Sequence, residues 1–260
     1  MPQSASLHHH ATRHINHLAA DRPWHWLAMG WSDLWRMPLA SMGYSLVFVG
    51  LGYLMAFGLY RIDYFYLVLP LSAGFMLVAP ILAVGFYEIS RSLEQGRTAS
   101  MAAMFLACRD HIGPLSAMGA VLMVLLLVWM RLSLLIFSLM FAGLTPTWDR
   151  FVETVFMSTQ GMPFLLVGGA FGLIFAIIVF AISAISIPQI YERGTNVVDA
   201  MLTSMAAVRS NGPMMMLWAG LIVLLTTAGL MLAFIGLLVT LPVVGFATWH
   251  AYRELVEQEP

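Results

Sequence analysis

The amino-acid sequence predicts an all-α fold, a polytopic transmembrane helix bundle with about six spans in three hairpins, each preceded by an amphipathic interfacial helix. The composition is the first reason: 60% of the 260 residues are hydrophobic and 10% are charged, whereas a soluble domain carries about 25% charged residues. The second is the length of the apolar runs, two of which contain 24 residues without a charge. About 20 apolar residues in a helix cross a hydrocarbon core of roughly 30 Å.

The clearest span is the run from Tyr64 to Tyr87, which has a late proline at Pro80 and a polar exit at Glu88 and Arg91. Weaker copies of this pattern follow Pro188 and Pro242. The expected spans are 38–60, 64–87, 114–141, 163–188, 213–231 and 233–252.

The boundary between the last two spans has no polar marker, because residues 210–252 contain no Asp, Glu, Lys or Arg. That segment is too long for one helix across a bilayer. We therefore expect the chain to reverse near Gly229 to Gly236, and a tight or re-entrant hairpin would also fit.

Three amphipathic segments are expected at the membrane surface, over residues 23–36, 98–112 and 195–208. In the first, Leu27, Trp31, Leu34 and Trp35 share one helical face. Tryptophan favours the headgroup level, so this helix should lie flat on the membrane. Each segment carries an arginine shortly before the proline that opens the next run. The predicted interfacial residues are Trp31, Trp35, Arg36, Arg109 and Arg209.

The arginines predict the orientation. Nine lie in the amino terminus, the 88–113 and 189–212 loops and the tail, against two, Arg61 and Arg150, on the opposite side. This positive-inside bias places both termini in the cytoplasm. The expected organisation is a polar, mobile tail over residues 1–22, a single transmembrane domain over 23–253 and an acidic tail over 254–260.

Arg131 is the only charged residue inside an expected span. An ionisable group in a membrane is costly unless it is paired, so it is a candidate contact for a ligand, a lipid or a partner subunit. Its position also lets it snorkel to the outer headgroups or pair with Asp149 or Glu153, and these are the structural interpretations.

No cofactor or metal site and no catalytic residue is predicted. His10, His14 and His17, with Asp21, have helical spacing that could hold a metal, but histidine-rich polar tails are common and nothing pre-organises this one. Three further histidines, His25, His111 and His250, are expected at the cytoplasmic edge of the membrane and are interpreted as boundary residues. The glutamates that follow the expected spans should form local ion pairs on solvated loops. These pairs would join Glu88, Glu94 and Glu192 with Arg91, Arg97 and Arg193.

Small residues form a ridge in the fourth expected span, at Gly168, Gly172 and Ala176. Such a ridge lets helices approach closely. Packing within the chain would explain it, and association with another membrane protein is the alternative.

A family resemblance is densest over residues 16–97. It is carried by Asn16-His17-Leu18, Asp21-Arg22-Pro23-Trp24, Trp26-Leu27, Gly30-Trp31, Asp33-Leu34, Pro38, Gly52-Tyr53-Leu54, Tyr66-Leu67-Val68-Leu69-Pro70-Leu71, Ala73-Gly74-Phe75, Leu77, Ala79-Pro80, Tyr87-Glu88 and Ser90-Arg91. In these residues the chain resembles a family of bacterial integral membrane proteins of unknown function, whose members are sometimes labelled as respiratory oxidase subunits. The resemblance implies an inner-membrane protein without assigned catalytic residues. A catalytic oxidase subunit needs intramembrane histidines for haem and copper, which this sequence lacks, so only an accessory role fits that label.

The expected function is therefore that of a non-enzymatic accessory or assembly factor in a membrane complex of the bacterial inner membrane. The alternative is a transporter or lipid-handling protein in which Arg131 meets an anionic group. The expected partners are the lipid bilayer and other membrane-protein subunits. The net charge of −1 argues against nucleic acid.

Overall fold

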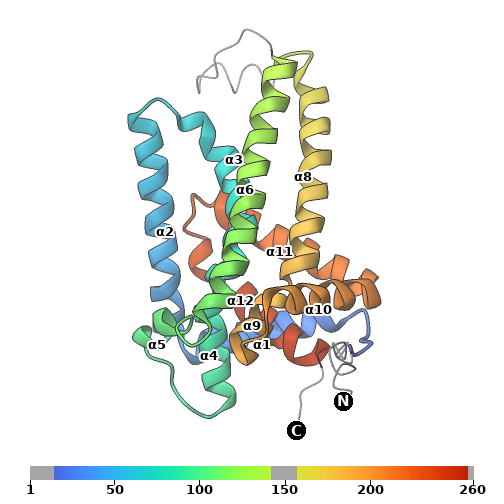
Figure 1. Cartoon of the computed structure of the whole chain (residues 1–260). Helices are drawn as coiled ribbons and strands as arrows, with labels where there is room; N and C mark the ends of the chain where they lie inside the picture. The colour runs from blue at the N-terminus through green and yellow to red at the C-terminus, as the bar shows by residue number, and fades with distance from the viewer. Residues whose placement is uncertain (1–14, 142–156, 257–260) are drawn as a thin grey trace, which may run out of the picture.

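The computed structural model describes residues 15–141 and 157–256, and these residues fold into helices with one isolated bridge between Ile15 and Val256 (Figure 1). The helices are α1 (Arg22–Arg36), α2 (Pro38–Arg61), the 3-10 helix η1 (Phe65–Leu67), α3 (Val68–Leu82), α4 (Val84–Glu94), α5 (Met101–Leu106), α6 (Ile112–Met140), α8 (Gly161–Ser183), α9 (Ser186–Arg193), α10 (Val197–Ser210), α11 (Gly212–Met231) and α12 (Leu237–Leu255).

Two groups of helices differ in direction. Helices α2, α6 and α8 run along the length of the molecule, whereas α1 and α10 lie across one end of it (Figure 1). Both ends of the described chain lie at that same end, which we call the terminal end. Of the expected surface helices, α1 and α10 match their predicted ranges closely, but α5 covers only six residues of the expected 98–112 segment.

Among the described residues, four helical segments are long and apolar enough to cross a membrane. They are Pro38–Arg61, Ile112–Met140, Gly161–Arg193 and Gly212–Met231. The expected spans 64–87 and 233–252 are not among them. The first is divided at Ala83 into α3 and α4, three residues after Pro80, which cannot donate to the carbonyl four residues earlier. The second corresponds to α12, which has a strongly polar C-terminal half.

The core is concentrated at the terminal end. Its largest fully buried side chains are Trp26, Trp218, Trp249, Tyr87, Tyr252, Phe86 and Phe246. The long helices contribute little to it: only 17% of the most apolar 18-residue window is buried in α2 and in α6. Most of the apolar surface of these helices therefore faces outward.

Helix α12 is the centre of this core, and α1 packs directly on its backbone. A Cβ atom on Gly30 of α1 would lie 2.7 Å from the carbonyl oxygen of Val243 and 2.9 Å from the amide nitrogen of Ala247. No side chain fits at these distances, so glycine is required here. This close approach brings the polar residues of α1 within reach of those of α12.

Candidate functional site

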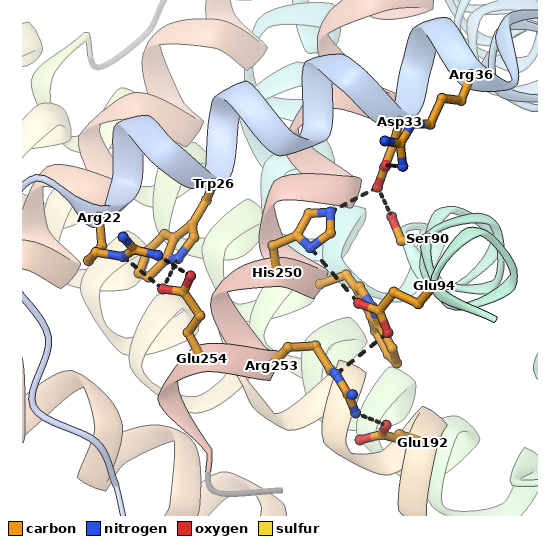
Figure 2. A network of polar contacts seen from close by, with 11 residues as sticks. Arg22, Trp26, Asp33, Arg36, Ser90, Glu94, Glu192, His250, Arg253 and Glu254 are labelled. Atoms are coloured by element: carbon orange, nitrogen blue, oxygen red, sulfur yellow. Dashed lines mark hydrogen bonds and ion pairs between the residues drawn. The ribbon is translucent and has the colours of Figure 1, made fainter. Parts of the chain in front are cut away.

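The C-terminal turns of α12 carry His250, Arg253 and Glu254, which contact different neighbouring elements (Figure 2). His250 meets α1, Arg253 meets α4 and α9, and Glu254 meets the start of α1. We call this set of contacts the terminal polar network. Its other members are Arg22, Trp26, Asp33, Ser90, Glu94, Glu192 and Trp249.

Asp33 is the most deeply buried carboxylate of the network, at 4% exposed. One of its oxygens, Oδ2, accepts a hydrogen bond of 2.7 Å from the hydroxyl of Ser90 and lies 2.8 Å from Nε2 of His250. Because a carboxylate oxygen accepts, Nε2 carries the proton. Two donors thus offset the cost of burying this charge.

This arrangement contains Ser, His and Asp but is not a catalytic triad. In a triad the histidine lies between the serine and the acid, so that it can take the serine proton. Here Asp33 lies between Ser90 and His250, and His250 is itself only 5% exposed. These hydrogen bonds join α1, α4 and α12, and an arrangement of this kind stabilises the packing of the three helices.

A second part of the network joins α4, α9 and α12. Nη1 of Arg253 lies 2.7 Å from Oε1 of Glu192, and its Nε lies 3.6 Å from Oε2 of Glu94. The indole of Trp249 donates to Glu94 at 3.0 Å, and the hydroxyl of Tyr252 donates to Glu192. Arg253 therefore bridges carboxylates that are distant in sequence.

The third part fixes the start of α1 to the end of α12. Arg22 binds Glu254 through two nitrogens, with Nε 2.9 Å from Oε2, and the indole of Trp26 donates to the same oxygen at 2.9 Å. Burial by itself would raise the pKa of Glu254, but the hydrogen bonds from Arg22 and Trp26 outweigh it and lower that pKa below its ordinary value. Asn16 adds a backbone hydrogen bond of 3.0 Å from its amide to the carbonyl of Leu255. Residues 15–22 and the end of α12 are thus in direct contact.

A hollow of about 210 Å³ adjoins the network between α4, α5 and α9. Its polar lining consists of Glu88, Arg91, Asp110, His111, Tyr191 and Glu192. Several of these groups satisfy one another: Tyr191 donates to Glu88, and the guanidinium of Arg91 lies 5.6 Å from the centre of the Tyr191 ring. Within the described residues no group of three or more His, Cys, Asp or Glu side chains is placed to hold a metal ion.

The predicted interfacial residues are all exposed and lie at the terminal end, on α1, after α5 and on α10. Trp31 and Trp35 are 49% and 58% exposed and contact each other. The face that was predicted for α1 is divided, because Leu34 is fully buried against the core while the two tryptophans point away from it. Only Arg36 approaches the network, 4.0 Å from Asp33.

Arg131 lies on an exposed part of α6, among the exposed apolar side chains of Val128, Leu134 and Leu135. Its proposed partners Asp149 and Glu153 lie outside the described residues, as do His10 and His14 of the amino-terminal histidine set.

The small-residue ridge of α8 is used in part by the chain itself. A Cβ on Gly172 would lie 3.2 Å from the Trp129 ring of α6, so α6 and α8 approach closely there. A Cβ on Gly168 would meet no atom of the described part of the chain within 4 Å. Internal packing therefore accounts for Gly172 and leaves Gly168 open.

Sequence reasoning missed most of the polar network. The expected local pairs are represented by Arg193 and Glu192, 3.6 Å apart, but the prediction of solvated loops was wrong, because Glu88, Glu94 and Glu192 lie in α4 and α9. His250, interpreted as a boundary residue, is buried. One sequence feature could have indicated the network. Asp33 shares a helical face with Trp26 and Gly30, and a carboxylate that is buried with that face needs a hydrogen-bond partner.

Comparison with known proteins adds one match. Residues 68–192 match the model of a family described as "Predicted integral membrane protein (DUF2189)". No curated protein and no solved structure matches the chain. The matched stretch runs from the start of α3 to the penultimate residue of α9 and so includes α6, α8 and the three acidic residues Glu88, Glu94 and Glu192. Over residues 68–192 the chain is therefore similar to this uncharacterised family of integral membrane proteins.

Proposed function

We propose that this protein is a non-enzymatic, multi-pass component of the bacterial inner membrane that acts as an accessory or assembly factor for a larger membrane complex. The observation that carries the proposal is the low internal burial of its long helices. In the most apolar window only 17% is buried for α2 and for α6, and 11% for the segment Gly161–Arg193. These helices use little of their surface to hold one another.

Glycines on the outward faces of these helices favour a protein partner over lipid alone. Among the described residues, a Cβ on Gly50 or Gly58 of α2, or on Gly168 or Gly169 of α8, would meet no atom within 4 Å. Glycine in a helix costs about 0.5–1 kcal/mol relative to alanine, and no packing among the described residues offsets that cost here. Close approach of another transmembrane helix is the usual use of such positions.

The distribution of arginines supports an orientation with both termini in the cytoplasm. Arg36, Arg109 and Arg209 are exposed at the terminal end, and both ends of the described chain lie there (Figure 1). The proposed single transmembrane domain spans residues 23–253, between polar ends at 1–22 and 254–260.

The test compares two substitutions on α8. Gly168→Leu fills the open glycine position, and Leu166→Phe alters an exposed apolar side chain on another side of the helix. We expect the chain, extracted from its own membrane in mild detergent, to retain a partner at fixed stoichiometry. Gly168→Leu should reduce that stoichiometry severalfold and Leu166→Phe should not. A solitary, monodisperse wild-type chain, or equal retention by both variants, would contradict the proposal.

A transporter or lipid-handling protein is the second candidate, favoured by the exposed guanidinium of Arg131 on the apolar surface of α6. Arg131 lies about 28 Å along the helix from Ile112, where it would reach an anionic headgroup or substrate. If this hypothesis is correct, Arg131→Leu lowers the amount of anionic lipid or anion that copurifies with the protein. If that variant keeps its lipid content and every complex intact, the second candidate is rejected.

A further inference from the structure

The connection between α11 and α12 has an unusual backbone. Ala233 and Phe234, two consecutive residues other than glycine, have φ angles of 51° and 65°. The left-handed conformation costs such residues about 1–2 kcal/mol each. The chain therefore turns here at a cost that surrounding contacts must offset.

Helix α2 supplies those contacts. The hydroxyl of Tyr53 donates a hydrogen bond to the carbonyl oxygen of Ala233, and the ring centres of Tyr53 and Phe234 lie 5.9 Å apart. A Cβ on Gly52 would lie 3.2 Å from the Phe234 ring, so this glycine leaves room for the aromatic side chain. The carbonyl at the turn is thus satisfied by a side chain of α2.

The composition of this turn differs from that of the turn after α2. The α2 turn contains Arg61 and Asp63, both exposed. By contrast, the segment from Leu230 to Val239 has no polar side chain. Met231, Leu232 and Ile235 are 83%, 66% and 58% exposed in the single chain. Such a surface suits an apolar environment.

Two measures along neighbouring helices place the turn short of the opposite end of the molecule. Gly52, which contacts Phe234, lies about 21 Å along α2 from Pro38, and α2 continues for about 13 Å beyond it. Gly236, immediately before α12, lies only about 10 Å along the helix axis from Val243, whose carbonyl oxygen lies against Gly30 of α1. Figure 1 agrees: the turn lies well below the upper ends of α2, α6 and α8.

We propose that α11 and α12 form a re-entrant hairpin. It enters the membrane from the terminal end, turns back inside the apolar layer, and is anchored there by Tyr53 of α2. The backbone groups of a turn at that depth cannot rely on water, and Tyr53 takes the place of water at the carbonyl of Ala233.

The crossings are then made by α2, by η1 continued through α3, by α6 and by α8. The second of these spans about 27 Å from Phe65 to Leu82, close to the thickness of a hydrocarbon core. Four crossings and six crossings both leave the two termini on one side of the membrane. Tagging the termini therefore does not distinguish them, and the position of the turn does.

The test uses nitroxide spin labels on single cysteines in the full chain, reconstituted in lipid vesicles, with the only native cysteine replaced by Cys108→Ala. Ile235→Cys is the test position and Ile62→Cys the matched control, because the two isoleucines are 58% and 60% exposed and lie in the two turns being compared. Val124→Cys on α6, which is 58% exposed and lies about 18 Å along the helix from Ile112, is the apolar reference, and Met231→Cys provides a second label at the hairpin turn.

We expect labels at Ile235 and Met231 to collide rarely with a water-soluble nickel complex, as at Val124, whereas the label at Ile62 collides with it often. Frequent nickel collisions at Ile235, equal to those at Ile62, would overturn the re-entrant hairpin. Tyr53→Phe removes the donor to Ala233 and should increase the mobility of the Ile235 label. An unchanged line shape would overturn the anchoring role of Tyr53.

Discussion

Replacing Asp33 with leucine should destabilise the protein more than any surface substitution, because it breaks the contact between α1, α4 and α12. The substitution leaves two buried donors, the hydroxyl of Ser90 and the ring of His250, without their shared acceptor. A buried donor left without its acceptor costs about 1–3 kcal/mol, or about 2–6 kcal/mol for the two. For a chain of this size 1 kcal/mol corresponds to roughly 2–4 °C, so we expect the melting temperature to fall by about 4–24 °C.

The assay is thermal unfolding in detergent, followed by tryptophan fluorescence, with two companion variants. Asp33→Asn keeps an acceptor oxygen for Ser90 and should recover part of the loss. Arg36→Gln removes only an exposed guanidinium 4.0 Å from Asp33, which is worth less than about 1 kcal/mol. If Asp33→Leu melts within the error of Arg36→Gln, the polar network does not hold the terminal end together.

Two further predictions concern the same end of the molecule. Because the pKa of Glu254 is lowered in the folded protein, its pair with Arg22 contributes stability that is complete above the ordinary carboxyl pKa of 4.5 and is lost as pH falls through the lower pKa of the folded state. The difference in melting temperature between wild type and Glu254→Gln should therefore shrink on acidification from pH 7 towards pH 3. A constant difference would contradict the pairing. Gly30→Ala places a methyl group against the backbone of α12 and should lower the free energy of unfolding by about 1–3 kcal/mol. The control is Gly220→Ala on α11, where no atom of the described residues lies within 4 Å. This variant should unfold at or above the wild-type temperature in the same assay.

The long helices could be predicted from sequence because their signal is local. An uncharged run such as the one that forms α2 identifies a helix of spanning length by composition alone. The reversal between Met231 and Leu237 was also expected, because the uncharged segment is too long for one helix. The interruption at Ala83 was not, since Pro80 lies within an apolar run whose overall length still fits a single span.

The polar network could not be predicted because its pairs join distant parts of the chain. Glu94 and Glu192 each have an arginine close by in sequence, which favours a local pair, yet both meet Arg253. That choice follows from the packing of α4 and α9 on α12. The α4 contact depends on Gly245, where a Cβ would lie 2.8 Å from the Phe86 side chain, and this role is visible only when the two helices are placed together. Long-range contacts of this kind leave little trace in one sequence.

The proposed accessory function requires that the outward faces of α2 and α8 contact a protein partner. The most direct test is the mass of the particle released intact from the native membrane, measured by mass spectrometry under non-denaturing conditions. We predict one defined mass, equal to this chain of 28.8 kDa plus a fixed additional polypeptide. A particle that contains only this chain and a variable number of lipids would contradict it.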